Sequence, residues 1–256
     1  MKDVSKSDVQ KEMQIENGME ICIDKRQAVL QIKLGHRKAV DFMGNKNLII
    51  TIEREYGSGG RIVGRKLAEE LGLHFYDDEI LKMASEKSAV GEEFFRLADE
   101  KAGNNLLHRL TGAKKADVFG KPSLKGDVTS PDNLFKFQAM VMRELAEQEP
   151  CVFVGRAAGY VLDQDEEIEN LIRIFVYADR VRRVQRVMEV DCISEERAKK
   201  RIRKIENERK NYYKYFTGND WKNMKNYDLP INTTRLGLDE TAELIKEYVK
   251  LRGYMK

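Results

Sequence analysis

The sequence predicts an α/β domain built on a five-stranded parallel sheet with helices on both faces. Short apolar runs, typical of strands covered on both faces, alternate along the chain with longer segments of helical periodicity. This alternation favours parallel strands joined by crossover helices. A glycine-rich turn leads from the first apolar run directly into a helix. The five predicted strands are residues 48–52, 75–76, 151–154, 171–178 and 227–232.

The first strand, turn and helix form the segment around which the rest of the chain is organised. Residues 48–72 read LIITIEREYGSGGRIVGRKLAEELG. The turn residues Gly57, Ser58, Gly59 and Gly60 permit close approach of backbone amides to a ligand. The positive end of the following helix lies at the same place. This pattern favours a phosphate site with a nucleotide as the leading ligand, although glycine turns also occur for purely steric reasons.

The turn lacks two groups that usually complete a nucleotide-binding P-loop. The usual motif adds a lysine for the β- and γ-phosphates and a hydroxyl for Mg²⁺. Gly60 occupies the position expected for the lysine, and Ile62 occupies the position expected for the hydroxyl. The nearest substitutes are Arg61, our candidate for the catalytic cation, and Ser58. Whether Arg61 reaches the phosphates is open, because a side chain one residue further along a helix is rotated by about 100°.

The segment 48–78 resembles the opening of bacterial cytidylate kinases, and more closely that of their divergent cytidylate kinase-like relatives. The resemblance covers the strand, the turn and the helix, and then the tract HFYD at 74–77. It resumes after Ser130 and spans most of residues 47–250. In those relatives too the loop reads like residues 54–61 and lacks the usual lysine.

This resemblance implies a three-layer P-loop kinase-type domain over residues 47–256. It further implies a helical acceptor-binding insertion at about 78–130 and a basic helical lid at about 180–216. Residues 1–46 fall outside the resemblance and are treated as an N-terminal extension of unknown role. Alternating apolar residues at 19–34 are compatible with a β-hairpin in this extension.

Composition argues against a membrane protein and against a secreted disulfide-rich protein. Charged residues make up 35% of the 256 residues, and no apolar stretch approaches the ~20 residues that span a bilayer. The N-terminus lacks the apolar core of a signal peptide, and the three cysteines show no paired spacing. We therefore expect a cytoplasmic protein without a membrane partner. The net charge of +3 is too small to indicate nucleic-acid binding, and the oligomeric state stays open.

The expected acceptor-binding segment begins at the end of the second strand. By the resemblance, Asp77 matches the aspartate of the Y-x-D-T-G motif of these kinases, whereas Asp78 and Glu79 replace its threonine and glycine. Asp78 is alternatively the cap of the helix that begins there. Residues 92–101 have helical periodicity. Residues 102–130 are rich in Gly, Lys, Asp and Ser, and they are expected to form a mobile acceptor loop or a plain surface insertion.

The third predicted strand ends in Gly155 and Arg156, at the edge where open parallel sheets bind ligands. These two residues resemble the G-R-D tract in which the arginine of cytidylate kinases reads the acceptor nucleotide. The resemblance therefore makes Gly155 and Arg156 acceptor-binding residues. Val154 and Ala157 stand where the family has aspartates, which leaves selectivity for cytosine open. The alternative for Arg156 is a structural ion pair with a local carboxylate.

A strongly basic stretch follows the fourth strand. Between Arg180 and Lys214 there are thirteen Lys or Arg and six Asp or Glu residues, a local balance of +7. These helices resemble the lid of nucleoside monophosphate kinases, where Arg183 matches a family arginine and Arg201 and Arg209 are further candidates for catalysis. Guanidinium forks suit the charge that spreads over a transferring phosphoryl group. The alternative is a solvated basic face.

The tract KNYYKYFTGNDW at 210–221 is both aromatic and basic. Such a composition is also found in platforms that stack single-stranded nucleic acid. The tract recurs in the cytidylate kinase-like relatives, followed as here by residues 226–229. We therefore assign it to the fold and expect no nucleic-acid partner.

The resemblance and the anion-binding pattern together predict ATP-dependent phosphorylation of a nucleoside monophosphate. CMP is favoured by the resemblance alone. Mg²⁺ is the expected cofactor, held mainly by the ATP phosphates. The missing lysine and hydroxyl leave open a nucleotide-binding sensor or regulatory module that has lost the transfer. The missing aspartates beside Arg156 leave open a kinase for another small phosphate acceptor.

Overall fold

The computed structural model describes residues 47–101, 120–125 and 127–255. The hairpin considered for the N-terminal extension lies outside the described residues, as does most of the expected loop at 102–130. Within the described part, strands and helices follow one another in the predicted alternation.

A five-stranded sheet forms the centre of this part of the chain, and all its neighbouring strands run parallel, as predicted. The strand order is β2-β3-β1-β4-β5, so the first strand in sequence is central. This strand extends two residues beyond its predicted end, because its pairing with the fourth strand continues to Arg54 opposite Val176. The strands are β1 (Ile49–Arg54), β2 (His74–Tyr76), β3 (Cys151–Val154), β4 (Leu171–Tyr177) and β5 (Leu229–Asn232).

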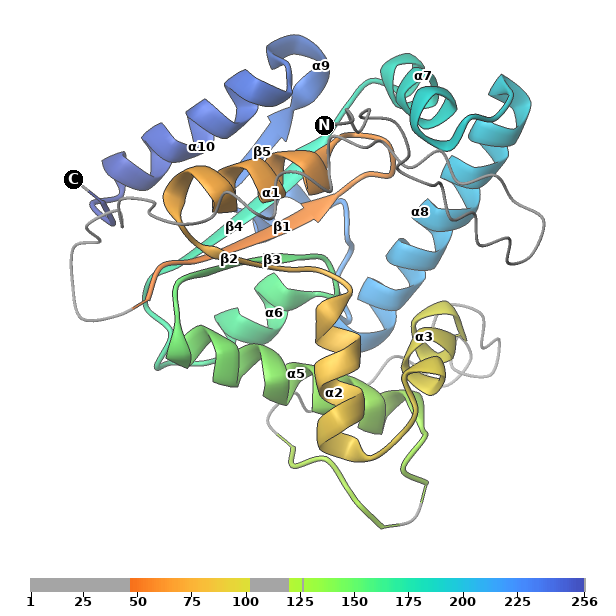
Figure 1. The fold of residues 1–256 in the computed structure, drawn as a ribbon, viewed down its shortest axis with the longest axis vertical. Coiled ribbons are helices and arrows are strands. Elements are labelled where there is room, and N and C mark those ends of the chain that lie inside the picture. The colour runs from red at the N-terminus through yellow and green to blue at the C-terminus, as the bar shows by residue number, and fades with distance from the viewer. Residues whose placement is uncertain (1–46, 102–119, 126, 256) are drawn as a thin grey trace, which may run out of the picture. The chain divides into compact units, whose positions relative to one another are not determined.

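Helices cover both faces of the sheet (Figure 1). The described helices are α1 (Gly60–Leu71), α2 (Glu79–Ser88), α3 (Glu92–Lys101), α5 (Pro131–Gln148), α6 (Ala158–Asp163), α7 (Arg180–Asp191), α8 (Glu195–Thr217), α9 (Thr233–Leu236), α10 (Leu238–Leu251) and the short 3₁₀ helix η2 (Met224–Asn226). Of these, α1 and α10 lie on one face, and α5 and α6 lie on the other (Figure 1). In the described part of the chain, no helix combines the length and apolar character that crossing a bilayer requires.

The helix α1 shows how the sequence pattern becomes packing. Its residues Val63 and Leu67 recur at helical spacing and are fully buried, in one apolar layer with Ile50 and Ile52 of β1. Gly72 ends the helix in a left-handed conformation with φ of 69°, which glycine adopts without strain. The first helix is thereby fixed against the sheet, with its N-terminus at the carboxyl end of β1.

The long helix α8 continues from the basic lid segment into the core. Its last turns bury Tyr212, Tyr213 and Phe216, and the Phe216 ring stacks on Phe135 with 4.1 Å between centroids. Trp221, just beyond the helix, is fully buried as well. These rings of the aromatic tract therefore pack in the interior and are not exposed for stacking on bases. The end of the expected lid segment belongs to the core.

Burial along the central strands predicts which side chains contribute most to the free energy of unfolding. Ile174 in β4 is fully buried, whereas Ile62 on α1 is 49% exposed. Ile174→Ala should lower the free energy of unfolding by about 2–5 kcal/mol, because it leaves a cavity among packed side chains. Ile62→Ala, the matched control, should change it by less than about 0.5 kcal/mol. Urea unfolding followed by circular dichroism measures both, and equal losses would contradict the packing described here.

Candidate functional site

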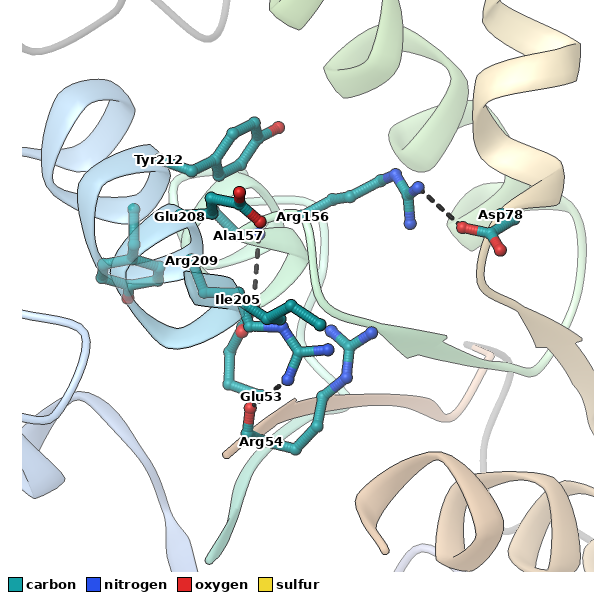
Figure 2. A pocket seen from close by; sticks show the side chains of 10 residues that line it. Glu53, Arg54, Asp78, Arg156, Ala157, Ile205, Glu208, Arg209 and Tyr212 are labelled. Atoms are coloured by element: carbon teal, nitrogen blue, oxygen red, sulfur yellow. Dashed lines mark hydrogen bonds and ion pairs between the residues drawn. The ribbon is translucent and has the colours of Figure 1, made fainter. Parts of the chain in front are cut away.

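A cavity of about 330 Å³ lies at the carboxyl ends of β1 and β3, with α8 as one wall (Figure 2). Parallel sheets bind ligands at this edge because the connecting loops and helix N-termini meet there. Three guanidinium groups reach the cavity from three different elements, together with three carboxylates. These lining residues are Arg54, Arg156, Arg209, Glu53, Asp78 and Glu208.

The glycine turn beside this cavity adopts the predicted strand, turn and helix arrangement. Gly57 and Gly59 have φ angles of 80° and 88°, in the left-handed region that favours glycine. The Ser58 carbonyl accepts a hydrogen bond from the Thr233 hydroxyl at 2.7 Å, and the Gly57 carbonyl accepts one from Arg186 at 2.7 Å. These contacts hold the turn from its outer side. Among the residues that the structure describes, no side chain caps the N-terminus of α1, and the first turn of this helix contains no acidic residue.

The two nearest substitutes for the missing P-loop groups are both engaged outside the turn. The Ser58 hydroxyl is buried and donates to the carbonyl of Glu55 at 2.9 Å. The Arg61 guanidinium turns towards the acceptor side, where its Nε lies 2.6 Å from Asp77. The rotation of each residue along a helix explains this direction. The structure therefore places Arg61 beside Asp77 and Asp78, after the end of β2.

Asp77 is the common partner of three guanidinium groups. Its carboxylate lies 2.6 Å from Arg61, 3.5 Å from Arg54 and 3.6 Å from Arg156. The residue is only 6% exposed. Because like charges repel strongly in a partly desolvated site, this carboxylate is what allows the three cations to gather. The structure thus gives Asp77 the role of a counter-ion within the expected acceptor site.

Asp78 and Arg156 form the next ion pair. Asp78 precedes the first residue of α2, but its side chain makes no capping hydrogen bond. It instead accepts from Nη2 of Arg156 at 2.9 Å (Figure 2). Burial opposes ionisation of Asp78, yet the Arg156 guanidinium holds the pKa of this carboxyl below its usual value. Arg156 therefore makes the ion pair considered from the sequence and also lines the cavity.

The backbone that carries Arg156 is held in an uncommon conformation. Gly155, Arg156 and Ala157 have φ angles of 82°, 55° and 53°, a run of left-handed residues between β3 and α6. Such conformations cost energy for residues other than glycine and recur at functional sites. The Ala157 N–H donates to Glu53 Oε1 at 3.1 Å, which helps to fix the turn. Gly155 and Arg156 are thus presented at the edge of the cavity.

Two of the three lid arginines singled out from the sequence do not line the cavity. Arg183 is 8% exposed, and its Nε lies 3.3 Å from Glu55. Arg201 is bound on the outside of the lid by Asp191, at 2.7 Å. Both side chains join parts of the fold, because α7 and α8 pack against each other and present these faces to acidic neighbours. In this conformation neither guanidinium is in position to contact a ligand in the cavity.

Arg209, from the middle of α8, does reach the cavity. Its Nη1 donates to the carbonyl of Arg54 at 2.8 Å, and its guanidinium lies 5.6 Å from the centroid of the Tyr56 ring. Burial lowers the pKa of Arg209, and the charge of Arg54 lowers it further. A buried guanidinium next to another cation is the environment in which a bound anion is most stabilising.

Sequence reasoning missed three charged residues that line the cavity, Glu53, Arg54 and Glu208. Glu53 is buried, and its Oε2 accepts from Nε1 of Trp221 at 3.1 Å. Arg54 lines the cavity from the end of β1. The sequence contains a signal for Glu53 and Arg54, because these two charged residues end a central strand. Charged residues are rarely buried unless they are paired or functional.

Comparison with known proteins extends over most of the chain. A family model described as the cytidylate kinase-like family matches residues 49–235. The cytidylate kinase of Methanopyrus kandleri is 27% identical over 209 residues, which cover 78% of this chain and 92% of that protein. The cytidylate kinase of Pyrococcus horikoshii is 27% identical over 206 residues, covering 80% and 89%. The crystal structure of an uncharacterized protein from Eubacterium ventriosum aligns with a TM-score of 0.57 at 25% identity, covering 80% of this chain and 99% of that one.

The role of Asp77 as counter-ion can be tested with a neighbouring aspartate as control. Asp77→Asn should lower the free energy of unfolding by about 3 kcal/mol, because it leaves clustered guanidinium groups without their shared carboxylate. Asp78→Asn removes the same charge from a side chain that is 53% exposed, and it should cost less than about 1 kcal/mol. Denaturant unfolding of the two variants gives the comparison. A smaller loss in Asp77→Asn than in Asp78→Asn would rule out the shared counter-ion.

Proposed function

We propose that this chain, which belongs to the cytidylate kinase-like family, transfers the γ-phosphoryl group of ATP to a nucleoside monophosphate. The relatives named cytidylate kinase support CMP as the first acceptor to test. The observation that carries the proposal is the cavity of about 330 Å³, into which three guanidinium groups point beside an uncapped helix N-terminus.

The cavity and the turn suggest separate places for donor and acceptor. We assign the ATP phosphates to the turn residues Gly57–Arg61, where the positive end of α1 and the glycine backbone favour a polyanion. We assign the acceptor phosphate to Arg156, which lines the cavity from the end of β3. Planar guanidinium groups bind phosphate oxygens in pairs, which fixes orientation as well as charge.

Catalysis at such a site would depend on positioning and on charge stabilisation. Charge spreads over the equatorial oxygens of the transferring phosphoryl group, and fixed cations stabilise it. Arg209 is well placed for this task, because it is buried next to the cavity and needs no reorganisation to face it. The oxygens of a monophosphate are already largely ionised at neutral pH, so the reaction requires no general base.

Mg²⁺ would enter this site as a complex with ATP. In the part of the chain that the structure describes, no three His, Cys, Asp or Glu side chains gather into a metal-binding group. Ile62 offers no oxygen, and the Ser58 hydroxyl is already engaged with Glu55. Mg²⁺ tolerates such sites because it keeps several waters and binds through phosphate oxygens. The ion would neutralise charge between the β- and γ-phosphates.

Two other functions remain in competition, each for a specific reason. Val154 and Ala157 replace the aspartates of the acceptor tract. Both side chains are apolar and almost fully buried, so neither offers a polar group to a cytosine ring. This favours testing acceptors other than CMP. The absence of the P-loop lysine and hydroxyl favours a nucleotide-binding sensor without transfer. Both alternatives use the same cavity, so ligand binding alone does not distinguish them. Turnover experiments do.

The proposed reaction predicts ADP release that depends on the acceptor. The full chain should release ADP from MgATP when a nucleoside monophosphate is present, and CMP should give the highest kcat/KM among monophosphates. A coupled ADP-release assay across a panel of monophosphates and small alcohols measures this. Turnover only with a different acceptor class would replace CMP and keep the transfer. ATP binding without turnover on any acceptor would favour the sensor.

The assignment of the acceptor to Arg156 predicts a separable kinetic effect. Arg156→Ala should raise the acceptor KM by at least about tenfold, equivalent to ~1.4 kcal/mol, while ATP affinity changes little. Arg203→Ala, which removes an exposed arginine from α8, serves as the control and should leave both values unchanged. Calorimetry with ATP and steady-state kinetics provide the two readouts. Weaker ATP binding with an unchanged acceptor KM would reverse the assignment.

A further inference from the structure

Arg54 occupies the space that a P-loop lysine would need. A Cβ atom on Gly60, the position expected for the lysine, would lie 2.6 Å from Cβ and 3.1 Å from Cγ of Arg54. The first distance is too short for a side chain to begin there while Arg54 keeps its place, and the second is tighter than an ordinary contact. A lysine at position 60 therefore requires Arg54 to move, or requires a residue at 54 that lacks these atoms, as glycine does. The same steric contact therefore relates the absence of a lysine at position 60 to the presence of Arg54.

A second glycine makes room for the other end of the same side chain. A Cβ on Gly155 would overlap Nη1 of the Arg54 guanidinium. Gly155 also has a φ of 82°, so a larger residue is disfavoured there on conformational grounds as well. The side chain of Arg54 thus runs between two glycines, from the end of β1 towards the end of β3. Its guanidinium is fixed within the cavity near Asp77, at 3.5 Å.

This guanidinium lies between the proposed sites of the phosphoryl donor and of the acceptor. On one side is the glycine turn, since Gly60 packs directly on the stem of Arg54. On the other side is Arg156, the proposed acceptor residue, which shares the carboxylate of Asp77 with Arg54. Figure 2 shows the guanidinium groups of Arg54 and Arg209 together within the cavity. A phosphoryl group passing from the turn to the acceptor would pass these two cations.

The local charges favour an anion at this place. Burial lowers the pKa of Arg54. Burial also lowers the pKa of Arg209, and the positive charge of Arg54 lowers it further. Among the described residues Arg209 forms no ion pair, and its Nη1 donates a hydrogen bond to the backbone carbonyl of Arg54. The carboxylate of Glu53 is held by Trp221 and by the N–H of Ala157. Two adjacent cations that are partly removed from water are stabilised most by an anion that both can contact.

We propose that Arg54 is the phosphate-binding cation of this site, in place of the P-loop lysine, and that it contacts the phosphoryl group during transfer. This inference rests on the proposed function for its kinetic part and on the cavity alone for its binding part. In the transfer, the bond from the γ-phosphorus to the bridging oxygen of ATP breaks and a bond to an acceptor phosphate oxygen forms. The products are ADP and a nucleoside diphosphate. Arg54 stabilises charge and gives up no proton.

The binding part can be tested without any turnover. Pyrophosphate is the probe, because it presents the phosphates without a nucleoside. Calorimetry on the full chain should show at least about tenfold weaker pyrophosphate binding in Arg54→Ala than in the parent, whereas Arg54→Lys should retain part of the affinity. Arg203→Ala is the matched control and should bind as the parent does. Unchanged pyrophosphate affinity in folded Arg54→Ala overturns the proposal.

The steric exchange provides a second and independent test. Gly60→Ala should weaken pyrophosphate binding by displacing Arg54, and it should add little to Arg54→Gly in the double variant, because the Cβ and Cγ atoms that it would meet are then absent. The exchange variant Arg54→Gly with Gly60→Lys returns a cation to the usual position and should recover affinity relative to Arg54→Gly. Circular dichroism and thermal unfolding verify that each variant folds. Full additivity in the cycle, with no recovery in the exchange variant, would falsify the proposal.

The kinetic part separates Arg54 from Arg61. Arg54→Ala should lower kcat by more than tenfold, with a smaller loss in Arg61→Ala, and added guanidinium ion should partly restore kcat to Arg54→Ala only. A merely structural role for Arg54 predicts no such rescue. A larger loss of both pyrophosphate affinity and kcat in Arg61→Ala would move the cation to Arg61 and overturn the proposal. If the parent turns over no acceptor but loses pyrophosphate affinity in Arg54→Ala, the proposed function fails and the anion site stands.

Discussion

The buried carboxylate of Asp77 is the constraint on which the arrangement of the site depends. It lies between 2.6 and 3.6 Å from the guanidinium groups of Arg54, Arg61 and Arg156, which come from β1, α1 and the turn after β3. Cations from three separate elements gather in a partly desolvated place only when an opposite charge lies among them. Asp77 itself is fixed by the end of β2, so the parallel sheet determines where the charges meet. The ion network thereby connects the helix that follows the glycine turn with the turn after β3.

The packing around Arg54 determines where the charge of its guanidinium lies. Gly60 and Gly155 lie on elements that are far apart in sequence, yet each leaves space for one part of the Arg54 side chain. A glycine in the first turn of a helix has no helical advantage, and its presence at Gly60 is explained by this close approach. The loop has therefore not simply lost a side chain. It has a different packing, in which the strand supplies a cation beside the turn.

The helix α8 connects the basic lid to the base of the cavity. Its N-terminal turns carry Arg201 on the outer face, its middle directs Arg209 inward, and its last turns bury Phe216 in the core. A continuous helix of 23 residues transmits position over its whole length, since its backbone hydrogen bonds leave few soft dihedral angles. Trp221, immediately after the helix, in turn positions Glu53 at the floor of the site.

The sequence by itself determined the parallel sheet, the strand, turn and helix at Gly57–Gly60, and the placement of Gly155 and Arg156 at the ligand-binding edge. Local periodicity and glycine spacing are enough for these features, because each depends on neighbours along the chain. Only the tertiary structure decided where the arginines point. Arg61 and Arg54 stand on either side of the same turn, yet one faces the acceptor segment and the other fills the space beside Gly60. Those directions depend on distant partners, above all Asp77 and Gly155, and no local pattern encodes contacts between residues brought together by the sheet.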